Sequence, residues 1–203
     1  MLISGNPQTG RHAPETTARV LVTVVSDANA PAMSMAADLQ RWRQQNPLAV
    51  WARADVPGGS AELRRAALIA AVTASRDRWH KHPTHLILLG AGAAGRLALE
   101  LVLEDVLACA GIVVADIPCA PPRLPIVSST TAVRLVVRKD GPVPADGLID
   151  ALRAADLDER ILMLPPGATR DAQAIASATG TFLLELVATI SRQASNGVRS
   201  HDD

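Results

Sequence analysis

The glycines at positions 90, 92 and 95 follow an apolar segment, LILL, and precede the segment RLALELV. Their spacing, Gly-x-Gly-x-x-Gly, lets a backbone turn approach a phosphate closely, and the helix that the turn opens can bind a pyrophosphate at its N-terminus. Asp116 ends the next apolar segment, at a spacing suited to a ribose hydroxyl. One hypothesis is therefore a dinucleotide site on Gly90, Gly92 and Gly95.

Three features of the chain weigh against that site. The dinucleotide motif usually opens its domain, whereas two apolar strand-like segments precede Gly90 here. The segment after Asp116, IPCAPPRLP, is too rich in proline to form the helical crossover that the motif requires. No later segment supplies an obvious catalytic partner for hydride transfer. We therefore expect no cofactor and no metal, and keep the dinucleotide site as an alternative.

Composition limits the broad class of protein. The chain has 203 residues with 20 basic and 20 acidic side chains, so its net charge is zero and nothing favours nucleic acid or an anionic membrane. No continuous apolar run approaches the roughly 20 residues of a membrane span, and the polar start is not typical of a secretory signal. The excess of arginine over lysine suggests a GC-rich bacterial genome. We expect a cytoplasmic protein with a polar tail at 1–17, one domain at 18–192 and a second tail at 193–203.

The elements that position the glycine turn alternate between strand and helix. Strands are expected at 19–25, 48–53, 85–89, 111–116, 132–138 and 160–165. Helices are expected at 35–45, 61–79, 93–107 and 171–191, and one further helix is expected to end at residue 154. This alternation predicts an α/β fold, a three-layer α/β/α sandwich around a mostly parallel sheet of about six to seven strands. Ligands of such folds bind at the carboxyl ends of the strands.

From about residue 19 to residue 190, the order of elements and motifs resembles the small carboxylesterase and lysophospholipase branch of the α/β-hydrolases. GAGAAG resembles the family's Gly-x-Ser-x-Gly-Gly elbow, the tight turn that carries the nucleophile, with Gly92 in the nucleophile's place. VVRKDGPVP resembles the segment of the catalytic acid, which implies Asp140 for that role. LMLPPGATRD resembles the turn of the catalytic base, with Ala168 or Thr169 where histidine is expected.

The functional prediction depends on the positions at which this chain lacks the catalytic residues of the family. Catalysis by a serine hydrolase needs a hydroxyl, a base and donors for the oxyanion. The resemblance leaves only the acid, Asp140, as a relic, and Ser26-Asp27 replaces the His-Gly that helps to build the oxyanion hole. Glycine at 92 is the residue that folding alone favours, because the elbow has positive φ. The predicted relic pocket is lined by Ser26, Asp27, Gly92, Ala93, Asp140, Ala168 and Thr169.

Other reactive side chains do not restore catalysis in this interpretation. His80, His82 and His85 flank the start of a central strand, opposite the elbow, and a solvated turn is the expected structure there. Cys109 and Cys119 form no ligand motif and are expected to be reduced, small and buried. The three tryptophans are expected in the core or at an interface.

The sequence therefore predicts an inactive carboxylesterase-like protein that binds a small apolar or ester-like ligand or a protein partner, with a homodimer included. A hydrolase acting through unidentified residues is the enzyme alternative, and the dinucleotide-binding protein is the second alternative. What fills the space between Gly92, Asp140 and Ala168 should distinguish between these three functions.

Overall fold

The computed structural model describes residues 19–28, 36–47, 49–79, 84–122, 125–127, 130–139, 145–165 and 172–199. Six parallel strands form one sheet in the order β2-β1-β3-β4-β5-β6. The strands are β1 (Arg19–Asp27), β2 (Val50–Val56), β3 (Thr84–Ala91), β4 (Gly111–Ala115), β5 (Ala132–Arg138) and β6 (Glu159–Leu164). The helices are α1 (Ala36–Gln45), α2 (Ala61–Arg78), α3 (Gly92–Leu103), α4 (Asp146–Ala154) and α5 (Ala172–Arg199).

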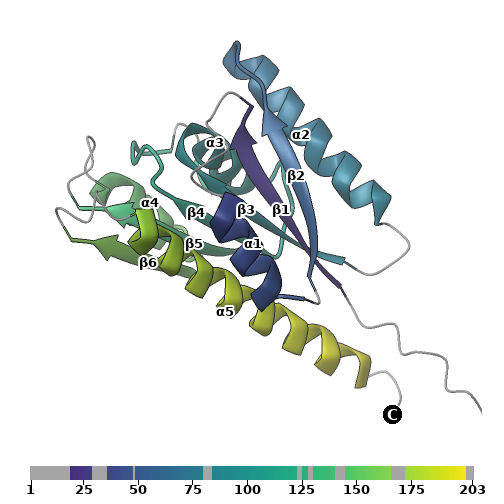
Figure 1. Ribbon diagram of the computed structural model, residues 1–203. Helices are drawn as coiled ribbons and strands as arrows, with labels where there is room; N and C mark the ends of the chain where they lie inside the picture. The colour runs from purple at the N-terminus through teal and green to yellow at the C-terminus, as the bar shows by residue number, and fades with distance from the viewer. Residues whose placement is uncertain are drawn as a thin grey trace, which may run out of the picture.

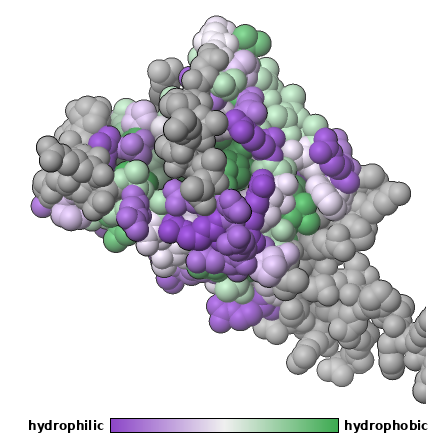
Figure 2. Space-filling view, in the orientation of Figure 1, coloured by the Kyte–Doolittle hydropathy of each residue, from purple (hydrophilic) through white to green (hydrophobic). Residues whose placement is uncertain are grey.

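The helices cover both faces of the sheet, which confirms the predicted three-layer α/β/α architecture. Helices α2, α3 and α4 pack on one face, over a core that includes Leu21, Leu88 and Leu148. Helices α1 and α5 pack on the other face, around Trp42, Ile87 and Leu183. Figure 1 looks onto the face that α1 and α5 cover. On the outside of that face the surface over these helices is largely hydrophilic (Figure 2).

The central strands have the sequence that two covered faces demand. β4 is buried along its whole length, and β5 is buried from Val133 to Val137. Such strands are continuous apolar runs instead of alternating ones, because neither face meets water. Arg134 in β5 is the charged exception, and it pairs with Asp158 and with Glu185 of α5. This ion-pair group joins α5 to the sheet at a buried position, since Arg134 itself is only 3% exposed.

Element boundaries differ from the sequence predictions at several ends. The β5 strand matches its prediction, whereas β2 runs on to Val56, three residues beyond its predicted end. Helix α3 ends at Leu103 instead of 107, because the backbone turns at Asp105, where φ is 57°. Helix α5 continues to Arg199, past the predicted start of a tail at 193. The proline-rich connection after β4 contains no helix among its described residues, as predicted.

Helix α5 is longer and more apolar than the sequence analysis suggested. By length and composition alone, its segment Ala172–Gln193 could cross a membrane. In the structure it packs against β4 and β5, and its buried side chains Leu183 and Leu186 belong to the core. A single helix of this kind is a weak indication of a membrane span, since a core helix passes the same test.

The contact between α1 and α5 depends on glycine at position 180. A Cβ atom on Gly180 would lie 2.4 Å from Nε1 of Trp42, whose ring is 2% exposed. The indole of α1 therefore packs directly on the backbone of α5, and any side chain at position 180 would push the two helices apart.

Replacing this glycine tests the contact. Alanine favours a helix by about 1 kcal/mol over glycine, but overpacking a core costs about 1–3 kcal/mol. Because the overlap is with a rigid, buried ring, Gly180→Ala is expected to lower the free energy of unfolding by about 1–2 kcal/mol in urea titrations.

The control uses the partner side chain. In the double variant Trp42→Phe/Gly180→Ala the smaller ring relieves the overlap, so its loss of stability should be less than the sum of the two single losses. A Gly180→Ala protein more stable than the wild type would contradict this packing of α1 on α5.

Candidate ligand-binding site

The turn between β3 and α3 has the geometry that the sequence predicted for an elbow. β3 is a central strand of the parallel sheet, and α3 begins at Gly92 without an intervening loop. Gly92 has φ of 57°, in the left-handed region where glycine has little strain. Another residue in that region costs roughly 1–2 kcal/mol, so the positive φ is itself a reason for glycine here.

Gly90 and Gly95 are required by a close approach of strand to helix. A Cβ atom on Gly90 would lie 2.7 Å from Cα of Gly95, and one on Gly95 would lie 2.7 Å from the carbonyl carbon of Gly90. Both contacts are with backbone, which cannot rotate away as a side chain can. The spacing of these two glycines is therefore explained by packing alone, with no need for a phosphate.

Gly92, at the position where the sequence resemblance places a nucleophile, carries no reactive side chain. Among the described residues, a Cβ atom on Gly92 would meet no atom within 4 Å beyond those of its own turn, so these residues leave room for a side chain there. Within the described ranges the only histidine is His85, near the start of β3 and so at the opposite end of that strand from Gly92. Asp140, Ala168 and Thr169 lie outside the described residues, although β5 and β6 end at Arg138 and Leu164, at the sheet edge where Gly92 lies.

Ser26 and Asp27, at the predicted oxyanion position, make contacts away from Gly92. The Ser26 hydroxyl donates to Oδ1 of Asp55 at 2.8 Å. Asp27 pairs with Arg64 of α2, and the amide of the following residue, Ala28, donates to Val56 O at 2.8 Å. These groups connect β1 to β2 and α2, so their hydrogen-bonding capacity is already used within the protein.

The same contacts set the charge state of Asp55. Burial raises the pKa of this carboxyl, but hydrogen bonds from Ser26 and Arg53 and the positive charge of Arg53 outweigh burial, and the net pKa lies below its ordinary value. Asp55 is therefore an ion-pair partner that stays ionised near neutral pH, and it is a poor proton donor.

A cavity of about 260 Å³ lies at the carboxyl edge of the sheet, beneath α1 and α5. Its walls come from the ends of three neighbouring strands and from two helices. The strands contribute residues 89–91 of β3, Ala115 at the end of β4 with the following Asp116, and Arg138 of β5. The helices contribute Asp38 and Trp42 of α1, and Ala172, Ile175, Ala176 and Thr179 of α5. The cavity therefore lies beside the elbow, and neither Gly92 nor Ala93 is among its lining residues.

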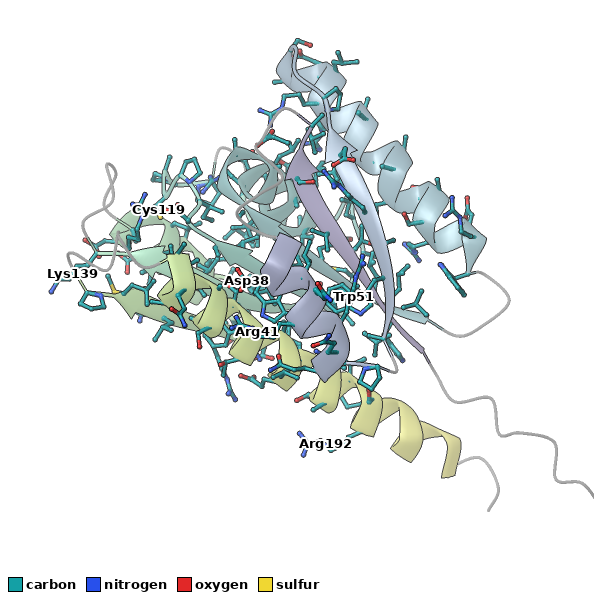
Figure 3. The ribbon with its side chains drawn as sticks, in the orientation of Figure 1. Asp38, Arg41, Trp51, Cys119, Lys139 and Arg192 are labelled. Carbon is teal, nitrogen blue, oxygen red and sulfur yellow. The ribbon has the colours of Figure 1, made fainter. Side chains whose placement is uncertain are left out.

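Two ion pairs lie at this cavity. Nε of Arg138 is 2.7 Å from Oδ1 of Asp116, which follows β4 and has φ of 50°. Asp38, in the first turn of α1, accepts a hydrogen bond of 3.0 Å from Arg41. Figure 3 shows Asp38 and Arg41 on α1, in front of the sheet. The rest of the wall is mainly apolar, so the cavity combines a hydrophobic body with a few charged groups, as small-molecule sites do.

Arg96 fixes the proline-rich connection that follows β4. Its guanidinium, buried in α3, donates to Pro118 O at 3.3 Å and Pro121 O at 3.2 Å, and its Nε donates to Glu100 at 3.0 Å. The carbonyls of a segment that cannot form a helix thereby find donors. This holds the backbone after Asp116 against the start of α3.

Both cysteines are free, and Cys119 is buried as the sequence predicted, whereas Cys109 is only partly buried. Burial raises the pKa of Cys109 to about 12, against smaller opposing effects of Thr131, the Gly111 backbone and Arg76. Burial also raises the pKa of Cys119. Since the thiolate is the nucleophile, neither side chain is suited to replace the missing serine.

The sequence matches no family model and no curated protein. In three dimensions it is similar to esterase PE8, with a TM-score of 0.63 and 20% identity over 84% of this chain and 93% of that one. It is also similar to the α/β-hydrolase enzyme MGS-M1 from a Medee basin deep-sea metagenome, with a TM-score of 0.61 and 13% identity over 76% and 71% of the two chains. Carboxyl esterase 2 of the fungus Tuber melanosporum gives a TM-score of 0.61 and 13% identity over 85% and 78%.

These similarities establish the architecture of the chain. It has the α/β-hydrolase fold, as the order of its motifs indicated, and its structural neighbours include esterases. At such low identities the likeness concerns the fold alone, so the chemistry must come from the residues of this chain.

Sequence reasoning missed most residues of the cavity. It did not single out Asp38, it considered Arg138 only as part of a charge cluster with Asp140, and it expected Trp42 in the core or at an interface instead of a ligand site. Arg138 could have been found, because it ends a strand at the edge where ligands bind in α/β folds. Asp38 and Trp42 reach the cavity only through the packing of α1 on α5, for which the sequence holds no local signal.

Replacing Gly92, which has a positive φ, and replacing Gly95, which contacts backbone, should lower stability by different amounts. Gly92→Ala meets no atom and should cost only the roughly 1–2 kcal/mol of a left-handed backbone. Gly95→Ala drives a Cβ atom into backbone and should cost about 3 kcal/mol or more. Urea titration of both variants measures the difference, and equal losses would mean that Gly90 and Gly95 are not in close contact.

Proposed function

We propose that this protein is a non-catalytic member of the α/β-hydrolase fold that binds a small, mainly apolar ligand with an acyl or ester group. The observation that carries the proposal is the pairing of an intact elbow, lacking any side chain at Gly92, with an adjacent cavity of about 260 Å³. The cavity supports a ligand-binding role over a purely protein-interacting one, because it offers a ready hydrophobic site.

The absence of catalysis rests on the residues at the carboxyl edge. Gly92 has no hydroxyl, and the only described histidine, His85, belongs to the other end of β3. Two donors described at the end of β1, the Ser26 hydroxyl and the Ala28 amide, already donate to Asp55 and to Val56 O. A hydrolase acting through other residues would need a nucleophile and a base that the described residues do not bring together.

The catalytic half of the proposal is tested with p-nitrophenyl esters. The wild type should give no turnover above a Gly92→Ala control, because neither protein has a nucleophile at the elbow. Gly92→Ser alone should also be inactive, since a hydroxyl without a base is a poor nucleophile. Gly92→Ser/Ala168→His should recover slight activity if Asp140 is the relic acid that the sequence resemblance implies.

Robust hydrolysis by the wild type that follows the protein through gel filtration would overturn this half of the proposal. It would require a catalytic group other than those of the elbow, and the enzyme alternative would then hold.

The binding half is tested by calorimetry with methyl pentanoate, a neutral ester small enough for the cavity. Ala172 and Gln173 are both exposed at the start of α5, but only Ala172 lines the cavity. Ala172→Phe should fill the cavity and weaken binding at least about tenfold, a loss of about 1.4 kcal/mol. The matched variant Gln173→Phe should bind like the wild type.

Two results would contradict the binding proposal. Equal affinities of the two phenylalanine variants would mean that the ester binds elsewhere. Micromolar binding of NAD, lost in a correctly folded Gly92 variant, would favour the dinucleotide alternative on Gly90, Gly92 and Gly95.

A further inference from the structure

One guanidinium, that of Arg138, lies in the wall of the cavity, and its contacts are incomplete. Its side chain is 29% exposed, and its only described partner is Asp116. The 2.7 Å contact joins Nε to a single carboxylate oxygen, and this buried Nε makes no hydrogen bond of ordinary geometry. No side-chain nitrogen of Arg138 donates a hydrogen bond of ordinary geometry to another described residue.

A guanidinium has two edges that can each hold a carboxylate. It carries five N–H donors in a planar fork, which matches the two oxygens of a carboxylate. Asp116 approaches from the Nε side with one oxygen. The two terminal nitrogens of Arg138 thus remain without a partner among the described residues, and a second, bidentate carboxylate would satisfy them.

The other charged groups at the cavity are already compensated. Asp38 pairs with Arg41 and lies in the first turn of α1, where the helix dipole favours a negative charge. Asp116 is compensated by Arg138 itself. Each carboxylate of the wall thus has a cationic partner among the described residues. The terminal N–H groups of Arg138 are therefore the feature of the wall that favours an anionic ligand.

We propose that the cavity takes a small carboxylic acid in its ionised form, with the carboxylate on the two terminal nitrogens of Arg138. The apolar chain of the acid would lie against Trp42, Leu89 and Ile175, which line the same cavity. Since drug-sized ligands occupy about 300–1,000 Å³, a cavity of about 260 Å³ fits a shorter molecule. This inference rests on the proposed function and names its ligand class.

Three probes of nearly equal shape separate the charge of the ligand from its apolar body. Hexanoate carries a carboxylate, and hexylammonium carries the opposite charge. Methyl pentanoate is neutral and is an isomer of hexanoic acid, the protonated form of hexanoate. Calorimetry on the full chain should give hexanoate the highest affinity, about 10- to 100-fold above methyl pentanoate, because hydrogen bonds to charged groups contribute about 1.5–3 kcal/mol.

Variants of Arg138 locate the charge that recognises the carboxylate. Arg138→Gln should remove most of the preference for hexanoate and leave the affinity for methyl pentanoate within about threefold, a change of about 0.7 kcal/mol or less. Arg138→Lys should give an intermediate preference, since lysine keeps the charge without the planar fork. Arg153→Gln, on an exposed arginine of α4, is the matched control and should bind like the wild type.

Each outcome decides between the proposals. If none of the three probes binds, the proposed function itself fails. If methyl pentanoate binds as tightly as hexanoate, or if Arg138→Gln keeps the preference, the cavity binds apolar ligands and the carboxylate inference fails alone. Tighter binding of hexylammonium would assign recognition to Asp38 and Asp116 and would overturn the inference. Circular dichroism of Arg138→Gln and Arg138→Lys separates a binding loss from misfolding.

Discussion

The close contact between Gly90 and Gly95 is the constraint on which the carboxyl edge of the sheet depends. A Cβ atom on either residue would lie 2.7 Å from backbone. Strand β3 and helix α3 can therefore approach this closely only if both positions are occupied by glycine. With both ends of the turn fixed in this way, the chain must reverse within the residues between them. Gly92 takes up that reversal with a φ of 57°. The elbow is therefore a consequence of packing, and it exists whether or not a nucleophile stands on it.

Above the strand ends, a second close contact shapes the cavity. Trp42 packs on the backbone of Gly180, which sets how near α1 comes to α5. The two helices then cover the ends of β3, β4 and β5 together, and the space left beneath them is the cavity. Arg96 restrains the proline-rich connection that follows Asp116, a residue of the cavity wall, through Pro118 and Pro121. The fixed walls favour a preformed site, which loses little freedom when a ligand binds.

The sequence predicted the fold well because the fold follows from local patterns. Apolar runs such as Gly111–Ala115 and the helical spacing around Leu183 belong to elements that are buried on a definite face. The positive φ of Gly92 was predictable for the same reason, since the turn is specified by its own residues. The end of α5 was not predictable, because its polar last turns give no apolar pattern to follow.

The cavity could not be predicted because its residues come together only through tertiary packing. Asp38 and Trp42 belong to α1, Arg138 ends β5, and Ala172 begins α5, so three separate elements supply these parts of the wall. Motif order directed attention to Ser26 and Asp27 instead. Those side chains contact Asp55 and Arg64, on the β2 and α2 side of the sheet.

The positions of the elbow and the cavity explain how one function could be lost and another kept. A nucleophile acts from the side chain at position 92, whereas the lining of the cavity includes residues 89–91 and not Gly92. Removing a hydroxyl from position 92 therefore leaves every wall of the cavity in place. It also relieves the strain of a left-handed backbone, roughly 1–2 kcal/mol. In the proposed function, glycine at the elbow thus favours stability in place of covalent chemistry, and it leaves Arg138 and the apolar wall available for the proposed ligand.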